Sequence, residues 1–411
     1  MKKKIWLLVF MIFIKSVGIL AQDVLYTQES PVLVTLYSVY FVDNNTGWIV
    51  GGNGTILHTD NKGKIWNQQS YDKTYDLHSI CFINESTGWI VGSHGIILKT
   101  IKGGTDWVEQ NVGISDTSFF DVFFVNDSTG WIVGRYGTIF NTSDGGDNWS
   151  YQSSNTQELL LSIYFINQDI GWIVGDRTIL KTINGGIDWV PQDSETNDSF
   201  KSVYFVNADT GWVVGGWNGA TILKTKDGGE NWTIENSGFS DNLRSIYFIN
   251  DSTAWIVGEK GTIFKTITQG ASWTQQESHT SISTLRSIYF TDINSGWVVG
   301  ENGIILSTIN VNSTGIEEAD NFHPDRMVLM QNYPNPFNPS TVIHFYLHQS
   351  GSVTLSIYNI RGEEIETLLQ DYYQAGQHEV FWNAEDFPSG IYLISLRSGN
   401  FSETKKIILQ K

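Results

Sequence analysis

The chain has 411 residues and a formal net charge of −18, with 17% charged and 13% aromatic residues. So acidic a chain is a poor partner for nucleic acid, because phosphate binding requires a basic surface. The single cysteine, Cys81, excludes an internal disulfide, and we expect it to be a small buried apolar residue.

Residues 1–21 have the pattern of a signal peptide. The lysines Lys2 to Lys4 precede an apolar run from Ile5 to Ile14, and Ala21 supplies a small residue at the expected cleavage point. The run is shorter than the roughly 20 apolar residues that span a bilayer. We therefore expect an exported protein with no transmembrane segment.

A tryptophan recurs every 40 to 43 residues through the next part of the chain. Each repeat holds four short apolar runs separated by turns rich in Gly, Asn and Asp, which predicts four antiparallel strands. Such a unit is typical of one propeller blade. A helical solenoid is the alternative, but the repeats lack a 3.6-residue apolar period. The recurring residues, which we expect to pack between neighbouring blades, are Trp48, Trp89, Trp131, Trp172, Trp212, Trp255 and Trp297.

The repeats predict an all-β fold, a seven-bladed β-propeller over residues 22–310. The seventh repeat lacks its last strand, and the segment Leu25–Ser30 resembles Trp273–Ser278, the last strand of the sixth repeat. We expect this N-terminal strand to complete the seventh blade and close the ring, because closure removes an open sheet edge.

A second tryptophan follows a Gly-rich turn in six of the repeats. The segments Asp144–Trp149 and Asp227–Trp232 match the Asp-box pattern of bacterial-neuraminidase-type repeats, in which the Asp caps a hairpin turn. Together with the recurring Gly-Trp-Ile-Val-Gly and Thr-Ile-Leu-Lys-Thr runs, these turns resemble the photosystem II stability and assembly factor family over residues 24–310. The resemblance implies a seven-bladed propeller that acts as a non-enzymatic assembly scaffold.

The last part of the chain, residues 327–411, resembles the type A sorting domain of the type IX secretion system. The Pro-rich run Gln331–Thr341 and the later strand-like runs Val353–Ile360 and Ile391–Leu396 carry this resemblance. It implies a small antiparallel β-sandwich, the secretion machinery as a partner, and release from the cell or attachment to its outer surface. The polar, acidic residues 311–326 are interpreted as a linker.

Asp-box propellers include glycosidases, so a polysaccharide-acting hydrolase is the alternative to a binding or adhesion module. Hydrolysis usually needs two facing carboxylates, and no pair with a recognisable context is found. We therefore predict a monomeric, non-enzymatic binding protein without catalytic residues, cofactor or metal.

A binding face is predicted where the repeats differ from each other, in the turn after the second strand and near the start of the first. Arginine suits carboxylates and aromatic rings can stack on a ligand, so we expect an acidic ligand or a glycan, carried by an unidentified surface glycan or protein. The predicted ligand-binding residues are Arg135, Tyr136, Arg177, Lys201, Trp217, Arg244 and Arg286.

Overall fold

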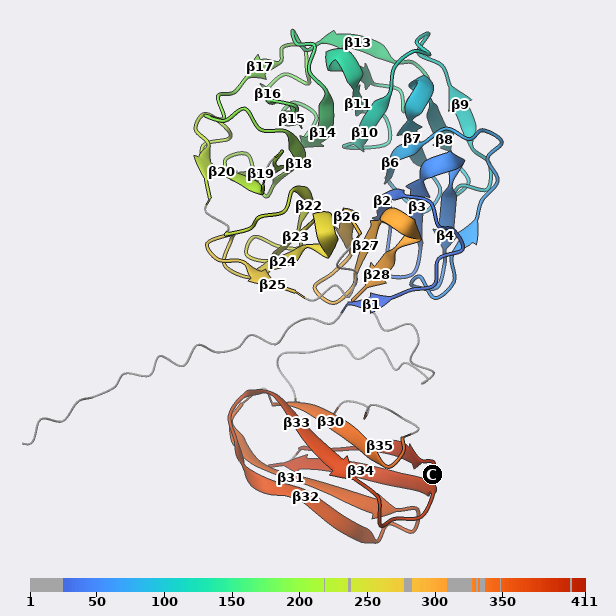
Figure 1. Ribbon diagram of the computed structural model, residues 1–411, viewed down its shortest axis with the longest axis vertical. Helices are drawn as coiled ribbons and strands as arrows, with labels where there is room; N and C mark the ends of the chain where they lie inside the picture. Colours follow the sequence, from blue (N-terminus) through green and yellow to red (C-terminus); the bar gives the residue numbers. More distant parts are fainter. Residues whose placement is uncertain are drawn as a thin grey trace, which may run out of the picture. The chain divides into compact units, whose positions relative to one another are not determined.

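The computed structural model describes residues 25–217, 219–235, 238–276, 283–308, 327–329, 332, 337–347, 349–399 and 401–411. The chain divides into two compact units, one ending at Thr314 and the other starting at Gly315 (Figure 1). The signal peptide predicted for residues 1–21 and the linker predicted for 311–326 lie outside the described residues. Within these residues, no helix is long and apolar enough to cross a membrane.

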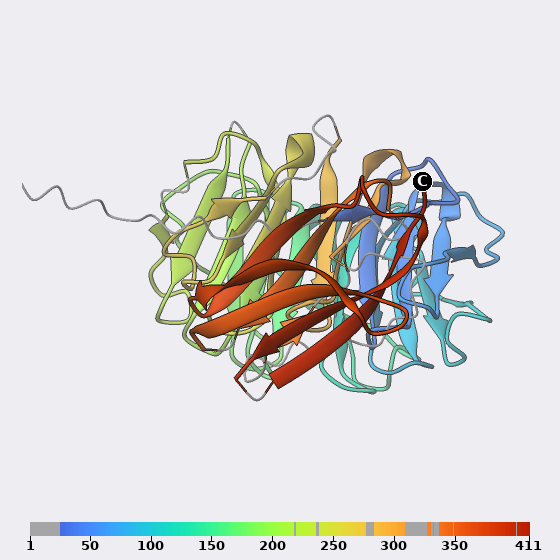
Figure 2. The same ribbon diagram turned by 90° about the horizontal axis from the view of Figure 1, so that it is seen from below.

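The first unit is a ring of seven four-stranded antiparallel sheets, so the prediction of a seven-bladed propeller is confirmed (Figure 1). Its strands run across the thickness of the disc, as the side view of Figure 2 shows. The first three blades comprise β2–β5 (Leu36–Phe41, Gly47–Gly51, Ile56–Thr59, Asn67–Gln68), β6–β9 (Leu77–Phe82, Gly88–Gly92, Ile97–Thr100, Val108–Gln110) and β10–β13 (Phe119–Phe124, Gly130–Gly134, Thr138–Thr142, Ser150–Ser153).

The other blades follow the same order, and in five blades a short 3-10 turn joins the second strand to the third. Blades 4 to 6 comprise β14–β17 (Leu160–Phe165, Gly171–Gly175, Thr178–Thr182, Val190–Pro191), β18–β21 (Phe200–Phe205, Gly211–Gly215, Thr221–Thr225, Thr233–Ile234) and β22–β25 (Leu243–Phe248, Ala254–Gly258, Ile263–Thr266, Thr274–Gln275). The turns are η1 (Gly52–Gly54), η2 (Ser93–Gly95), η3 (Arg135–Gly137), η4 (Glu259–Gly261) and η5 (Glu301–Gly303).

Blade 7 is completed by the N-terminal strand, as predicted. Its strands β26–β28 (Leu285–Phe290, Gly296–Gly300, Ile305–Ser307) are followed at the outer edge by β1 (Tyr26–Thr27), which pairs antiparallel with β28. Gln28 extends this pairing, since its backbone N–H donates to the Ile305 carbonyl at 2.9 Å. Its side chain accepts a hydrogen bond from the Trp66 indole at 3.1 Å, as Gln69 does from Trp107 in the next blade at 3.2 Å.

Aromatic stacks join the blades. Each tryptophan of a second strand lies against the phenylalanine that ends the first strand of the next blade, and Trp297 of blade 7 stacks on Phe41 of blade 1 at 3.5 Å between ring centroids. A glycine underlies the phenylalanine ring, because a Cβ at Gly47 would lie 2.5 Å from the Phe41 ring. In blade 6, Ala254 occupies this place, and the Phe248 ring above it is tilted by 33° from the Trp212 ring.

The Asp-box turns of blades 3 and 5 each tie their blade to the preceding one. Asp144 accepts hydrogen bonds from the Asn148 backbone at 2.9 Å and from the Thr142 hydroxyl at 2.8 Å. These bonds close the turn, and the Gly145 carbonyl at its tip accepts a hydrogen bond from the Trp89 indole of the preceding blade at 3.0 Å. The turn is therefore part of the blade-to-blade packing.

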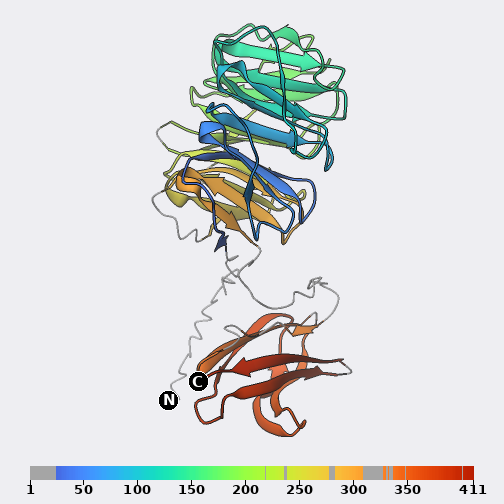
Figure 3. The ribbon, with the colours of Figure 1, turned by 90° about the vertical axis from the view of Figure 1, so that its right-hand side faces the viewer.

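The second unit contains two antiparallel sheets that share one apolar core (Figure 3). Phe345, Trp382, Leu355 and Ile394, drawn from both sheets, are all fully buried in it. The predicted β-sandwich is thus confirmed. Its sheets are β29-β30-β33 (Val328–Leu329, Ser340–Leu347, Gly376–Asn383) and β32-β31-β34-β35 (Glu364–Tyr373, Gly351–Asn359, Gly390–Ser398, Phe401–Leu409).

Candidate ligand-binding site on the propeller axis

One residue near the start of the first strand is left unpaired in every blade. In blade 6, Leu243 pairs with Gly258 and Ser245 pairs with Val257, so Arg244 is the extra residue of a β-bulge. A β-bulge changes the direction in which the side chain of its extra residue points. The first strands are the innermost strands of the ring (Figure 1). We name the seven half-buried bulge residues the bulge ring: Tyr37, His78, Phe120, Leu161, Lys201, Arg244 and Arg286.

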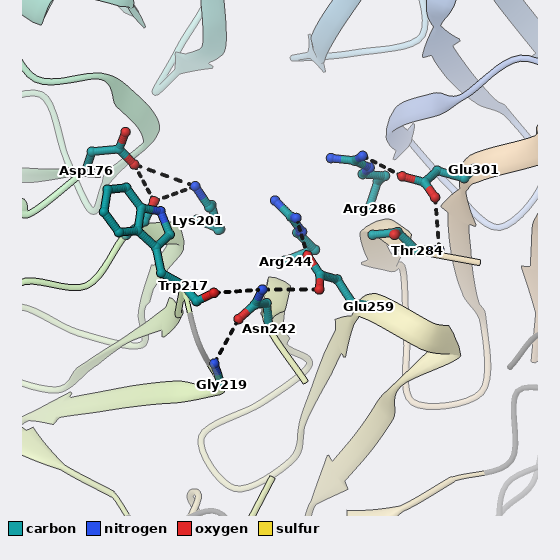
Figure 4. Close-up of polar contacts among 11 residues, drawn as sticks. Asp176, Lys201, Trp217, Gly219, Asn242, Arg244, Glu259, Thr284, Arg286 and Glu301 are labelled. Atoms are coloured by element: carbon teal, nitrogen blue, oxygen red, sulfur yellow. Dashed lines mark hydrogen bonds and ion pairs between the residues drawn. The ribbon is translucent and has the colours of Figure 1, made fainter. Parts of the chain in front are cut away.

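The bulge ring has two chemically different parts. Lys201, Arg244 and Arg286, from the consecutive blades 5 to 7, form its cationic arc, and their side chains point toward one another (Figure 4). The other four residues, Tyr37, His78, Phe120 and Leu161 of blades 1 to 4, form its apolar arc.

Each arginine of the cationic arc is held by a glutamate of its own blade. Arg244 Nη2 donates to Glu259 Oε1 at 2.5 Å, and Arg286 Nη2 donates to Glu301 Oε1 at 2.6 Å (Figure 4). Partial burial would raise the pKa of Glu301, but the hydrogen bond and charge of Arg286 outweigh it and lower that pKa. Glu259 lies in η4 and Glu301 in η5, the 3-10 turns that follow the second strands of blades 6 and 7. Through these ion pairs, each glutamate holds the guanidinium group of its arginine in place.

The two guanidinium groups retain unused donors. A guanidinium carries five N–H donors, and the Nε atoms of both Arg244 and Arg286 are buried without a hydrogen-bond partner among the described residues. A buried donor left unsatisfied costs about 1–3 kcal/mol. These Nε atoms are enclosed by protein, so a bound carboxylate would accept hydrogen bonds from the Nη groups of the half-buried arginines.

Lys201 adds a third positive charge. Burial lowers its pKa, Asp176 at 3.6 Å raises it, and the charges of Arg244 and Arg286 lower it again, with a net decrease. The cations of the arc therefore repel one another. An anion placed among them would relieve that repulsion.

Trp217 lies beside the cationic arc, in an insertion of blade 5 between β19 and β20 (Figure 4). Its side chain is 51% exposed. Asn242 connects the insertion to the arc, because its amide oxygen accepts from the Gly219 backbone at 3.1 Å and its amide nitrogen donates to Glu259 at 3.1 Å (Figure 4). These bonds hold the backbone of the insertion next to Glu259, and the exposed indole lies on the side of Asp176 and Lys201 (Figure 4).

The other three predicted residues lie in the turns that follow the second strands of blades 3 and 4. Arg177 donates to both carboxylate oxygens of Glu158, at 2.9 and 3.1 Å. Arg135 and Tyr136 are exposed in η3, where Tyr136 has a left-handed φ of 57°. Among the described residues, no hydrogen bond or ion pair joins any of the three to the cationic arc. The structure therefore brings together Lys201, Trp217, Arg244 and Arg286.

Sequence reasoning missed the residues that position the cations. Asp176, Asn242, Glu259 and Glu301 were not predicted to belong to the site. A signal was available for the glutamates, because each follows its arginine by 15 residues. The apolar arc was also not assigned to the site.

The chemistry available at the cationic arc is anion binding. All three carboxylates next to it are ion-paired, Asp176 with Lys201 and the two glutamates with the arginines. Across the part of the chain that the structure describes, no group of three or more His, Cys, Asp or Glu side chains could hold a metal ion.

Comparisons with known proteins agree with this architecture. The family model described as photosynthesis system II assembly factor YCF48 matches residues 21–116, 106–189, 148–238 and 234–309, and the model described as secretion system C-terminal sorting domain matches residues 331–410. No curated protein matches the chain.

Solved structures with the same fold include YCF48 bound to D1 peptide, at 21% identity and a TM-score of 0.62, covering 70% of this chain and 97% of that chain. YCF48 from Cyanidioschyzon merolae has 19% identity and a TM-score of 0.60, covering 70% and 98%. A catalytically inactive virginiamycin B lyase from Staphylococcus aureus with quinupristin has 14% identity and a TM-score of 0.61, covering 69% and 98%.

The resemblance to a type IX secretion sorting domain is confirmed, and such a domain directs export to the extracellular space or the outer cell surface. The propeller match extends from residue 21 to residue 309, well over half of the chain. The chain therefore belongs to the family of the photosynthesis system II assembly factor YCF48, and it carries a secretion sorting domain at its C-terminal end.

Proposed function

We propose that this propeller is an exported, non-enzymatic binding module whose cationic arc grips a carboxylate of a ligand outside the cell. The observation that carries the proposal is the cluster of three half-buried cations, Lys201, Arg244 and Arg286, whose side chains point toward one another while a glutamate holds each arginine (Figure 4). A relative with this fold has been seen with a bound peptide. Ligand binding by a propeller of this type is therefore physically reasonable for this chain as well.

The ion pairs also favour binding over glycoside hydrolysis. A glycosidase needs one carboxyl group that donates a proton and a second that is free to act as base or nucleophile. At the cationic arc, Glu259 and Glu301 each contact an arginine at 2.6 Å or less. Both carboxylates are therefore already engaged with a guanidinium group.

The test uses the full-length protein and two double variants with opposite expected effects. Arg244→Gln with Arg286→Gln removes the donors and should weaken binding of acidic peptides and glucuronate oligosaccharides on an array by about tenfold or more. Glu259→Gln with Glu301→Gln removes the competing carboxylates and should strengthen it. Arg177→Gln, which alters an arginine outside the arc, is the matched control.

Binding that is equal in all three variants and the parent would rule out the cationic arc as the site. Raising the salt concentration gives a second check, since screening weakens attraction between partly exposed charges. A carboxylate ligand that binds the parent equally well at about 0.05 M and 1 M salt would also contradict the proposal.

A further inference from the structure

We propose that the bulge ring selects carboxylates that carry an aromatic or aliphatic group, in preference to hydroxyl-rich sugar acids. This inference rests on the proposed function and specifies its ligand. It assigns a role in specificity to the apolar arc, Tyr37, His78, Phe120 and Leu161. The shared chemistry is a carboxylate within a few bonds of an apolar group, as in a free aromatic acid or in a peptide.

The two arcs meet at the junction of blades 7 and 1. The guanidinium carbon of Arg286 lies 5.9 Å from the centroid of the Tyr37 ring. A group attached to a carboxylate that contacts Arg286 would therefore meet an aromatic side chain next. Because both residues occupy the same bulge position on adjacent blades, the scaffold fixes this spacing.

Aromatic contacts continue from Tyr37 around the arc. The rings of Tyr37 and His78 have centroids 5.1 Å apart at an interplanar angle of 67°, and those of His78 and Phe120 are 5.4 Å apart at 52°. Edge-on and tilted packing of this kind is favourable for aromatic pairs. All three residues are only half-buried, so they present a continuous apolar surface beside the cations.

His78 belongs with the apolar residues rather than with the cations. Burial lowers its pKa, Asp76 raises it, and Arg135 and Arg286 lower it further, to about 4. At neutral pH the imidazole is therefore uncharged. The His78 Nε2 atom lies 3.1 Å from the Ser93 hydroxyl, so this hydrogen bond occupies one of the two ring nitrogens.

The bulge ring offers few acceptors for sugar hydroxyls. Among its seven residues, only the Tyr37 hydroxyl and the His78 imidazole carry a side-chain acceptor, since lysine and arginine only donate and Phe120 and Leu161 have no polar side-chain atoms. The neighbouring carboxylates of Asp176, Glu259 and Glu301 already accept from lysine or arginine. A sugar acid placed here would lose hydration of its hydroxyl groups without regaining hydrogen bonds, which costs free energy, whereas an apolar group would gain by leaving water.

The first experiment measures dissociation constants for small probes with the unmodified full-length protein by NMR titration. N-acetylphenylalanine should bind roughly tenfold more tightly than N-acetylserine and glucuronate, and N-acetylphenylalanine amide should bind most weakly. The His78 ring signals should shift with N-acetylphenylalanine and stay unchanged with N-acetylserine. The tripeptide acetyl-Ala-Ala-Phe distinguishes the sources: clearly tighter binding than N-acetylphenylalanine indicates a peptide, and equal binding indicates a free acid.

The second experiment changes the apolar arc. Tyr37→Ser with Phe120→Ser should reduce the preference for N-acetylphenylalanine over N-acetylserine to near one, while the affinity for N-acetylserine stays the same. Tyr151→Ser, at a tyrosine that is 61% exposed on the outer strand β13, is the control. Thermal unfolding of each variant checks that the propeller is intact.

The outcomes separate this inference from the proposed function. If the two acetylated acids bind the parent equally, or if the preference survives in the double variant, the apolar arc does not select the ligand, although the cationic arc can still bind carboxylates. If neither acid binds, the proposed function fails and this inference fails with it. A preference for glucuronate would overturn the inference and favour a glycan ligand.

Discussion

Closure of the propeller by its N-terminal strand can be tested with two leucine truncations. The Leu25 side chain is 3% exposed and packs with Ile263 and Leu306 in one apolar cluster. Removing a buried leucine side chain beyond Cβ costs about 2–5 kcal/mol, because apolar burial is lost and a cavity remains. Leu33, eight residues later, is 85% exposed, and its truncation should change stability by less than about 0.5 kcal/mol.

The assay is urea unfolding of full-length Leu25→Ala, Leu33→Ala and parent protein, followed by tryptophan fluorescence. Leu25→Ala should move the midpoint to lower urea, and Leu33→Ala should leave it in place. Removal of residues 22–30 should be more damaging, because it also uncovers the edge of β28. If Leu25→Ala and Leu33→Ala unfold at the same urea concentration, or if the truncated protein melts like the parent, closure by this strand contributes nothing to stability.

Three further predictions concern single positions of the propeller. Burial raises the pKa of Asp121 to about 6, although hydrogen bonds from the Ile163 backbone and the Ser79 hydroxyl lower it. The Asp121 carboxyl therefore loses favourable energy as pH rises through 6, and the stability of Asp121→Ser relative to the parent should increase by about 1 kcal/mol between pH 5 and pH 7 in urea unfolding. Tyr136→Asn should raise stability by roughly 1 kcal/mol in the same assay, because asparagine tolerates the left-handed φ of 57° better; an unchanged midpoint would argue against strain there. Gly47→Ala should lower the melting temperature at a cost of about 1–3 kcal/mol, since the new methyl group would overlap the Phe41 ring, and a variant as stable as the parent would refute this overlap.

The fold could be predicted from the sequence because every blade repeats the same strands, turns and packing residues. The tryptophan period, the glycine that ends each second strand and the Leu25–Ser30 segment together identify seven blades and their closure. These residues repeat because the packing between blades is the same at each junction, as the Trp297–Phe41 stack at the closing junction shows.

The candidate site could be predicted only in part. The basic residues were visible as differences between repeats, but the β-bulge that turns them toward the axis depends on backbone register, which the sequence pattern does not report. Arg135 and Arg177 are equally unusual in sequence, yet they lie in the turns after the second strands of blades 3 and 4 and not at the bulge position. The role of Glu259 and Glu301 depends on ion pairs that require the three-dimensional arrangement of a whole blade.

The bulge position accepts more kinds of side chain than the position that follows it. The residue after it is serine in six blades and Asp121 in the other, and some of these side chains bond across to the adjacent blade, as Ser79 does to Asp121 at 2.8 Å. The bulge itself accepts aromatic, aliphatic and basic residues without disturbing the strand register. Since packing does not dictate the residue there, a run of three cations on adjacent blades of an acidic protein requires another cause. The proposed recognition of a carboxylate would supply that cause, because an anion among the cations would relieve the repulsion that remains after their pairing with Asp176, Glu259 and Glu301.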